Sequence, residues 1–405
     1  MSNKKSSAGN KGDNVRSDCY IELVLRNSGG IKTDLKSKVE SMYGESIHEL
    51  VIDMCRFFNI KNAKIKIEDY GALPFTIAAR IETALKRNSP GIKKEYLLAI
   101  NKKSQYKSAK QRLRRSRLYL PGNEPKYFIN AGLHKPDCII LDLEDSVAPN
   151  EKDSAQLVVR NALRSVNFYG SERMVRINQL PEGLNDLKYI VPHNVHVILI
   201  PKCESANNVK RVDKEIIRIL KIKNITTEIF LMPIIESALG VINSYEIASA
   251  SKNICSLAIG LEDYTADIGT QRTEEGKESF YARSMVINAA CAAGIQPIDT
   301  VYSDITNMEG LRESVIEAKG LGFEGKGCIH PRQVKIVHEA FAPTLQEIEK
   351  AKKIVITFEE ADKKGLGVVS IGSKMIDAPV VKRAQKTIEM AIQVNLLHRN
   401  WYADN

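Results

Sequence analysis

The sequence has little that would mark a membrane or secreted protein. It has no apolar run near the roughly 18 to 20 residues that cross a bilayer, and its first residues, MSNKKSSAGNKGD, lack the apolar core of a secretory signal. Its seven cysteines are odd in number, widely spread and never in a C-x-x-C pair, so neither a disulfide framework nor a thiolate zinc site is indicated. We therefore expect a cytoplasmic protein with reduced cysteines and no membrane contact.

Positive charge is concentrated in one segment. The 405 residues carry 59 Lys or Arg against 49 Asp or Glu, a net charge of +10, and twelve of the cations but only one acid, Glu95, lie between Lys86 and Arg117. This segment has a break at Pro90-Gly91, few apolar anchors and no known nucleic-acid recognition pattern. We interpret residues 89–115 as a solvated basic linker between two domains and expect no nucleic-acid partner.

Residues 1–88 have the pattern of a small α+β domain. Alternating apolar residues predict strands, and apolar residues at three- and four-residue steps predict helices. The predicted strands and helices are 19–26, 31–36, 39–58, 64–70 and 74–85. A unit of this size can fold, but only around a modest core.

After residue 115, short apolar runs alternate with amphipathic segments. The eight runs are 116–120, 138–144, 173–178, 196–201, 228–236, 256–263, 296–302 and 326–331. Eight β/α units match a closed barrel better than an open doubly wound sheet, which has fewer strands and a Gly-rich first turn. We therefore predict an α/β protein with a (β/α)8 TIM barrel over 116–345, preceded by the small α+β domain and followed by a helical extension over 346–405.

Ionisable side chains lie at the end of most of these runs. They are Glu144, Asp145, Arg176, Lys202, Glu236, Asp263, Asp299 and His330. A barrel brings the carboxyl ends of its strands to one mouth, where the active sites of barrel enzymes lie. The sequence therefore predicts a polar site with several carboxylates and at least two cations.

Two of these carboxylates suit a metal ion. Glu236 and Asp263 are one β/α unit apart, so we expect them on adjacent strands. Together with Glu144 and Asp145 across the mouth, they suit a hard divalent cation such as Mg²⁺, which keeps water or substrate oxygens as its other ligands. A network of arginines and carboxylates that only holds the rim together explains the spacing equally well.

Two further features have structural interpretations. Gly320 to Gly327 match G-x-G-x-x-G, but the motif follows a helix and enters a strand, the reverse of a phosphate-binding loop. We interpret it as a helix C-cap and chain reversal. His330 could be a base or a metal ligand, but a histidine before Pro331 at a strand end is equally consistent with a structural hydrogen-bonding residue, so we assign it no part in the chemistry.

A series of longer motifs covers about 112 to 390 in order. It comprises RRSRLYLPG (114–122), LDLEDSVAPNEKDSA (141–155), VRIN (175–178), IPKCESA (200–206), IIESALG (234–240), GLEDYTADIGTQRTEEG (260–276), DTVYSD (299–304), GFEGKGCIHPRQ (322–333) and GSKMIDAPV (372–380). This series resembles the citrate lyase beta subunit and the related malyl-CoA and citramalyl-CoA lyases. The resemblance implies a homo-oligomeric barrel enzyme, a trimer or hexamer, that cleaves a carbon–carbon bond in an acyl thioester.

The same resemblance implies roles for individual residues. It implies Mg²⁺ at Glu236 and Asp263, with Glu236 also at the substrate, and a substrate-binding arginine at Arg176. It also implies that Asp377 reaches the mouth of a neighbouring subunit and exchanges a proton at the acetyl carbon. For such a reaction, further assignments are Glu144 and Asp145, which would orient metal-bound water, and Arg117 and Arg272, which would bind anionic substrate groups.

The first domain resembles the citrate lyase acyl carrier protein, the gamma subunit. The matching segments are SDCYIELVL (17–25) and IEDYGALPFTIAARIETAL (67–85). That family carries a phosphoribosyl-dephospho-coenzyme A group on a serine in a Gly-x-x-x-Ser-Ser-Asp-like segment. In this chain Arg16 occupies the usual serine position, and Ser17 is the adjacent hydroxyl that the resemblance implies as the attachment site.

Carrier and lyase, which are normally separate chains in this family, are fused here. The fusion predicts a lyase that cleaves a citryl thioester on its own carrier to oxaloacetate and an acetyl thioester, as in citrate fermentation, with a citrate lyase alpha (transferase) subunit as a partner. We expect the basic linker to tether the arm at high effective concentration. One alternative is a lyase for free CoA thioesters with a degenerate carrier domain, and a second is a non-enzymatic scaffold that uses the basic segment.

Overall fold

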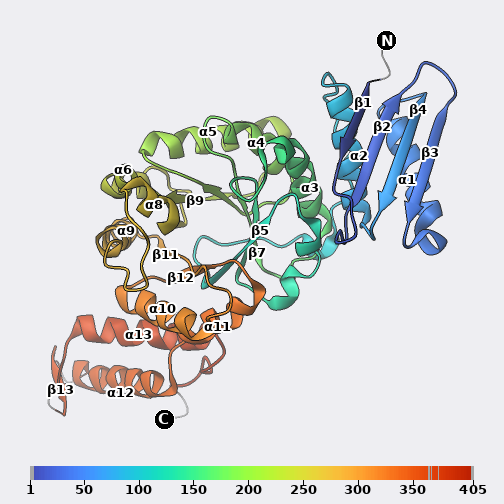
Figure 1. The fold of residues 1–405 in the computed structure, drawn as a ribbon. Coiled ribbons are helices and arrows are strands. Elements are labelled where there is room, and N and C mark those ends of the chain that lie inside the picture. The colour runs from blue at the N-terminus through green and yellow to red at the C-terminus, as the bar shows by residue number, and fades with distance from the viewer. Residues whose placement is uncertain (1–3, 364, 366, 373, 403–405) are drawn as a thin grey trace.

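The computed structural model describes residues 4–363, 365, 367–372 and 374–402. Along the chain it contains a four-stranded sheet with two helices, a closed eight-stranded barrel, and an extension of two helices and a hairpin (Figure 1). The predicted TIM barrel behind a small α+β domain is confirmed. No helix in these ranges combines the length and the apolar character needed to cross a membrane.

The first domain has one strand more than we predicted. Its elements are β1 (Lys5–Ala8), β2 (Cys19–Leu25), β3 (Ile31–Ser37), α1 (Glu40–Phe57), β4 (Ala63–Asp69) and α2 (Pro74–Asn88). The sheet order is β1-β2-β4-β3, and β3 is parallel to β4. β1 was missed because its sequence, KSSA, has no apolar alternation. The predicted apolar stripe of α1 is buried at Ile47, Val51 and Met54.

The barrel strands close in the order of the chain. They are β5 (Ser116–Pro121), β6 (Cys138–Asp142), β7 (Glu172–Arg176), β8 (Val197–Ile200), β9 (Phe230–Ile235), β10 (Ser256–Ile259), β11 (Gln296–Val301) and β12 (Gly325–Cys328). The helices around them are α3 (Lys152–Ser165), α4 (Gly183–Ile190), α5 (Ala206–Lys223), α6 (Ala238–Ile242), α7 (Ser244–Ala248), α8 (Leu261–Asp267), α9 (Phe280–Ala292), α10 (Met308–Leu321) and α11 (Pro331–Phe341). Short 3-10 turns lie at Lys102–Ser104, Pro125–Tyr127, Ala131–His134 and Pro149–Glu151.

The barrel strands are largely buried on both faces, and β6, β8 and β9 are accordingly nearly continuous apolar runs. One core lies inside the barrel and includes Ile140, Met174 and Met232, and a larger one lies between strands and helices. On β6 and β7 the inward positions recur every second residue. This alternation aims Asp142 and Arg176, the last residues of the two strands, toward the mouth.

Residues 89–115 connect the two domains, but they are not the solvated linker that we expected. The Tyr106 hydroxyl donates to the Ser171 carbonyl at 2.7 Å. Arg114 forms an ion pair at 2.7 Å with Glu172 at the barrel bottom, and both side chains are fully buried. The partners of Tyr106 and Arg114 lie more than fifty residues away in the sequence, so local composition could not reveal them. The segment is therefore packed on the barrel, and part of its charge is neutralised internally.

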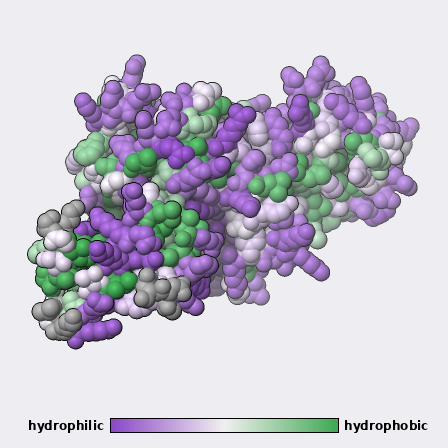
Figure 2. Space-filling model, turned by 90° about the horizontal axis from the view of Figure 1, so that it is seen from below, coloured by the Kyte–Doolittle hydropathy of each residue, from purple (hydrophilic) through white to green (hydrophobic). Residues whose placement is uncertain are grey.

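The C-terminal extension has a small core of its own. It contains α12 (Leu345–Asp362), β13 (Val369–Ile371), β14 (Lys374–Ile376) and α13 (Ala378–Gln393), and α12 and α13 pack against each other. Seen from below, apolar patches interrupt the hydrophilic surface over this extension at the near left (Figure 2). Leu345 and Met375 are among its exposed apolar side chains.

Candidate active site at the carboxyl ends of the barrel strands

Asp142 and Arg176 form the rigid part of the mouth. They are register partners on adjacent strands, and the guanidinium of Arg176 donates from Nε to Oδ1 at 2.7 Å and from Nη2 to Oδ2 at 2.8 Å. Burial alone would raise the pKa of Asp142, but the hydrogen bonds and charge of Arg176 outweigh it and lower that pKa. This two-point pair fixes the plane of the guanidinium.

Glu144 lies on the free side of that guanidinium. Its Oε2 is 2.9 Å from Arg176 Nη1 in an ion pair, and its Oε1 accepts from the Gln179 amide at 3.0 Å. Burial raises the pKa of Glu144 to about 7, although the charge of Arg176 opposes the shift. Glu144 can therefore hold or release a proton near neutral pH. Asp145, half exposed, is 3.6 Å from the same guanidinium.

Glu236 faces Arg176 and Glu144 from the end of β9. Its Oε2 accepts from the backbone N–H of Lys202 at 2.8 Å, and burial raises its pKa to about 8. The side chain lies against Gly260, where a Cβ would be 2.5 Å from Oε1. Only glycine allows this close approach, so the first residue after β10 helps to position the carboxylate.

Asp263 completes the group, but from a helix. The run 256–263 was predicted as one strand, and the structure ends β10 at Ile259 and places Asp263 in the first turn of α8. Its Oδ1 is 3.0 Å from Lys202 Nζ. Burial favours the neutral amine of Lys202. The hydrogen bond to Asp263 and the charge of that carboxylate outweigh this effect, so the pKa of Lys202 is raised. Lys202 thus contacts Glu236 through its backbone and Asp263 through its side chain.

This donor set fits a hard divalent cation. In the described part of the chain no group of three or more His, Cys, Asp and Glu side chains is arranged to enclose a metal. Mg²⁺ does not need such a cage, because it commonly takes one or two carboxylates and keeps water or substrate oxygens as its other ligands. Glu236 and Asp263, both of which contact Lys202, are two such carboxylates.

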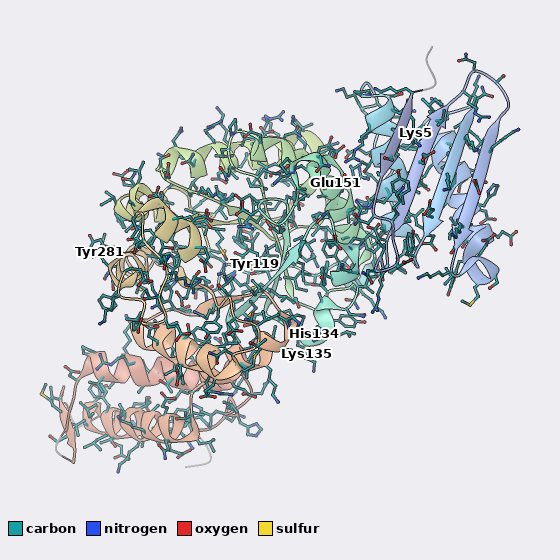
Figure 3. All side chains as sticks on the ribbon, viewed as in Figure 1. Lys5, Tyr119, His134, Lys135, Glu151 and Tyr281 are labelled. Carbon is teal, nitrogen blue, oxygen red and sulfur yellow. The ribbon has the colours of Figure 1, made fainter. Side chains whose placement is uncertain are left out.

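Tyr119 is a site residue that we did not predict. It lies inside the barrel beside Ile140, one layer below Asp142, and is labelled at the barrel centre in Figure 3. The guanidinium of Arg176 lies 5.4 Å from its ring centroid. No described residue hydrogen-bonds its hydroxyl. The alternation of the strand could have revealed Tyr119, because every second residue of a barrel strand points inward and position 119 is one of these.

The two other predicted arginines are placed differently. Arg117 is 1% exposed inside the barrel, where its guanidinium contacts the Met232 sulfur and the Asp299 carbonyl, so the structure does not bring it to the mouth. Arg272 lies at the rim, where it pairs with Glu262 at 2.6 Å. Of the three predicted arginines, Arg176 is the one in contact with the acidic side chains of the mouth.

Three further residues lie away from the mouth. Asp299 points outward from β11 and binds Lys326 at 2.6 Å and Arg283 at 3.2 Å. His330 caps α11 through Nδ1, which confirms its structural interpretation. Asp377 caps α13 by accepting from the Val380 N–H at 3.2 Å. The hairpin that precedes Asp377 lies at the outer end of the extension (Figure 1).

Ser17 lies in the loop before β2 with a left-handed φ of 55°. Its N–H donates to the Tyr70 carbonyl at 3.0 Å, while its half-exposed hydroxyl has no hydrogen-bond partner among the described residues. Lys38 lies over the Tyr70 ring at 5.7 Å, and Arg16 is exposed beside Ser17. A free hydroxyl beside the exposed cation Arg16 fits the attachment of a phosphodiester.

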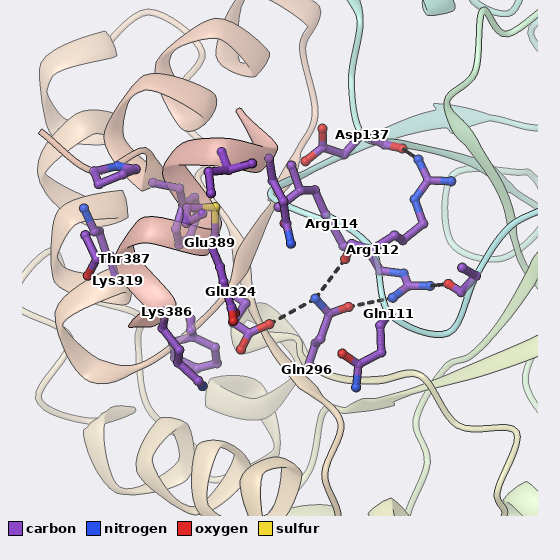
Figure 4. Close-up of a pocket in the computed structure, with 18 of the residues that line it drawn as sticks. Gln111, Arg112, Arg114, Asp137, Gln296, Lys319, Glu324, Lys386, Thr387 and Glu389 are labelled. Carbon is purple, nitrogen blue, oxygen red and sulfur yellow. Dashed lines mark hydrogen bonds between the residues drawn. The ribbon is translucent and has the colours of Figure 1, made fainter. Parts of the chain in front are cut away.

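A large hollow opens at the opposite end of the barrel. It has a volume of about 1520 Å³ and lies between the amino ends of the strands and α13. Gln296 joins its walls by accepting from Arg114 at 2.6 Å and donating to Glu324 at 3.0 Å (Figure 4). Because the titratable mouth residues are at the other end, we do not assign the chemistry to this hollow.

Comparisons with known proteins agree with this geometry. Residues 115–331 match the HpcH/HpaI aldolase/citrate lyase family, and residues 6–88 match the malonate decarboxylase delta subunit (MdcD) family of carrier proteins. The citrate lyase beta subunit of Haemophilus influenzae is 43% identical over 283 residues, which cover 69% of this chain and 97% of that protein. Human mitochondrial citramalyl-CoA lyase is 31% identical over 293 residues, which cover 69% of this chain and 86% of that protein.

Solved structures give the same result. The protein CitE of Mycobacterium tuberculosis, crystallised with magnesium, acetoacetate and coenzyme A, matches with a TM-score of 0.58 and 26% identity, covering 69% of this chain and 98% of that one. This chain therefore belongs to the HpcH/HpaI aldolase/citrate lyase family and carries, in front of its barrel, a domain of the malonate decarboxylase delta subunit type.

Proposed function

We propose that this chain is a Mg²⁺-dependent lyase that cleaves a citryl thioester held on its own carrier domain to oxaloacetate and an acetyl thioester. Residues 1–88 would be the carrier, 116–345 the lyase and 346–405 an extension that completes a neighbouring site. The main support is the convergence of Arg176, Glu236 and Asp263 at one mouth, in a chain whose relatives include citrate lyase beta subunits. The carrier-type domain supplies a place for the thioester.

The reaction breaks the bond between the hydroxyl-bearing carbon and the thioester methylene. The hydroxyl gives its proton to the water that Glu144 and Asp145 would orient beside it. Its oxygen becomes the keto oxygen of oxaloacetate, and the electron pair of the broken bond forms a thioester enolate. Protonation of the methylene carbon then yields the acetyl group. Both the alkoxide and the enolate carry negative charge, so the site must stabilise two anions in succession.

The residues of the mouth suit these needs. Arg176, fixed by Asp142, presents Nη1 to a substrate carboxylate or to the enolate oxygen. Glu236 and Asp263 would hold Mg²⁺, which when bound supplies Lewis-acid stabilisation of the alkoxide and lowers the hydroxyl pKa. Glu144 and Asp145 would orient water beside the substrate hydroxyl. Asp377, from a neighbouring copy, would donate the proton to the methylene carbon.

We further propose a phosphoribosyl-dephospho-coenzyme A arm on Ser17, a trimer or hexamer, a citrate lyase alpha subunit as partner, and a cytoplasmic location. Arg272, paired with Glu262 at the rim, remains the candidate for a distal carboxylate. The free hydroxyl of Ser17 and the exposed Arg16 beside it support the arm. The dependence of the proposed mechanism on a residue from a neighbouring copy supports the oligomer.

Two measurements test this function. The first is the mass of peptide 1–25 from protein made in its native host, where a phosphoribosyl-dephospho-coenzyme A adduct on Ser17 is expected. The second is citryl thioester cleavage by Glu236→Ala, Asp263→Ala and Arg176→Ala, all of which should stay folded and lose activity. Full activity in any of these variants removes that residue from the mechanism.

A lyase for free CoA thioesters is the second candidate. It is favoured by Arg16, which occupies the position of the usual modified serine, and by the similarity to citramalyl-CoA lyase. An unmodified Ser17 in protein that cleaves a CoA thioester would establish this candidate and leave the first domain without a carrier role.

A further inference from the structure

The carrier-type domain is joined to the barrel through a buried polar interface between α2 and α3. Arg160 of α3 donates to both carboxylate oxygens of Glu82 on α2, at 3.0 and 2.8 Å, and both side chains are fully buried. Asn161 donates to the Phe75 carbonyl at 3.0 Å. Beside these polar contacts, Phe75 and Ala79 of α2 are buried in the apolar core of the barrel domain. Burial of this apolar surface favours one fixed arrangement over a mobile one.

Arg80 connects the Ser17 loop to the barrel. Its guanidinium pairs with Asp18, the residue after Ser17, from Nε at 3.0 Å and from Nη2 at 2.8 Å. The same guanidinium donates to the Ser154 hydroxyl at 2.6 Å and to the Asn123 carbonyl at 2.8 Å, both of which belong to the barrel domain. One side chain therefore spans the distance from the Ser17 loop to the barrel.

Both barrel partners of Arg80 lie at the mouth end. Asn123 follows the carboxyl end of β5, and Ser154 is in the first turn of α3, just after the loop that carries Glu144. In that loop Lys152 donates to the Glu144 carbonyl at 2.7 Å. Glu151, labelled in Figure 3, lies at the junction of the two domains. The carrier domain is thus attached with the Ser17 end toward the rim of the mouth.

From these contacts we propose that the carrier domain stays docked on α3 of its own chain and presents the acyl arm of Ser17 in cis, to the mouth of the same barrel. The arm moves while the domain does not. This inference rests on the proposed function for the arm, but the docking does not depend on it. The packing of residues 89–115 on the barrel supports the same arrangement, because it leaves no free tether for a swinging domain.

A substitution on the barrel face tests the docking without touching the interior of either domain. Ser154→Arg places a second guanidinium against Arg80, while the Asp18–Arg80 pair inside the carrier is kept. Scanning calorimetry should show one cooperative transition for the wild type and a separate, earlier transition of the carrier domain in the variant. The matched control is Asn207→Arg, an exposed position in the first turn of α5, which should keep the single transition. A single transition in Ser154→Arg as well would overturn the docking.

Enzyme kinetics test whether the docked carrier domain delivers its acyl group to the mouth of the barrel. We expect Ser154→Arg to lower turnover of the carrier-bound acyl group at least tenfold and to leave cleavage of a free citryl thioester unchanged. Equal loss on both substrates would mean that the variant damages the barrel, and no loss on either would overturn delivery from the docked position.

Mixed chains separate delivery in cis from delivery in trans. Ser17→Ala, with an intact barrel, is co-expressed with Glu236→Gln, which has an intact Ser17. Delivery in cis predicts no cleavage of carrier-bound acyl groups above that of each variant alone, and recovered activity in the mixture would overturn it. An unmodified Ser17 in active wild-type protein would remove the proposed carrier function and the delivery with it, while the calorimetry would still decide the docking.

Discussion

The carboxylate of Glu236 occupies the space that a side chain at position 260 would need. A Cβ on Gly260 would lie 2.5 Å from Oε1 and 2.8 Å from Cγ of Glu236. Gly260→Ala should therefore push the carboxylate out of its position and lower kcat/KM about 10²-fold, the scale of loss expected for a shift near 1 Å at a reacting centre. Steady-state kinetics at saturating Mg²⁺ measure this loss.

The control for that change is Gly320→Ala. A Cβ at Gly320 meets no described atom within 4 Å, and the residue lies in α10, so the substitution should keep wild-type activity and unfolding temperature. Equal kinetics of the two alanine variants would show that the contact between Glu236 and Gly260 has no part in catalysis.

Arg176→Lys tests the hydrogen-bonding geometry of the guanidinium rather than its positive charge. Lysine keeps the positive charge but cannot donate to both oxygens of Asp142 and also face Glu144. We expect kcat to fall about 10²-fold or more. Arg218→Lys is the matched control, because Arg218 makes a similar two-point pair with Glu215 on the surface of α5. Unchanged kcat in Arg176→Lys would argue for a purely electrostatic role of this residue.

Tyr119→Phe removes the one hydroxyl that lies below the mouth without a partner among the described residues. If this hydroxyl donates to a substrate oxygen, kcat/KM should fall about tenfold, the value of one hydrogen bond. The unfolding temperature should not change, because no internal hydrogen bond is lost. Tyr245→Phe, at an exposed position in α7, is the control. A lower unfolding temperature with normal kinetics would instead assign Tyr119 to packing.

Acid should destabilise the contact between the connecting segment and the barrel. His196 accepts from the Arg173 N–H at Nδ1 and contacts the Tyr106 carbonyl at 2.8 Å through Nε2. Burial, together with the charge of Arg173, lowers its pKa from 6.5 to about 4. The stabilisation by the neutral ring is therefore complete above pH 6.5 and is lost as the pH falls toward 4.

Between pH 7 and pH 5 this residue should cost about 2 kcal/mol of unfolding free energy. Urea titrations at the two pH values measure it, and His196→Gln should show a smaller difference between them. His134→Gln, at an exposed position of the barrel domain, should behave as the wild type. If the difference in His196→Gln equals that of the wild type, other groups cause the acid sensitivity.

The barrel was predictable because most of its strands leave a local signal. The strands β6, β8 and β9 are mostly apolar because both of their faces are buried, whereas β12, with the sequence GKGC, is buried without an apolar run. The prediction that functional residues lie at strand ends correctly placed Arg176, which ends β7, and Glu236, which follows β9. Asp142 was missed because the predicted run 138–144 extends two residues past Asp142, where β6 ends. Tyr119 was missed because it lies within β5 and not at its end.

Other errors came from contacts that are distant in the sequence. Arg117 was expected at the mouth, yet it reaches across the interior to a backbone carbonyl 182 residues away. The segment 89–115 was expected in solvent because its composition is basic, and composition does not show that Glu172 lies opposite Arg114. Charge counts along a chain show how much charge is present but not which charges are paired.

The buried pair of Glu82 and Arg160 makes the fusion of the two domains hard to reverse. A barrel severed before residue 116 would present Arg160 and Asn161 in the middle of α3 without the groups that now bind them, next to the apolar contact made by Phe75 and Ala79. Such a fragment would expose to water the apolar surface of α3 that Phe75 and Ala79 now cover. The two domains therefore constrain each other's evolution, and changes on α2 and α3 should be inherited as matched pairs.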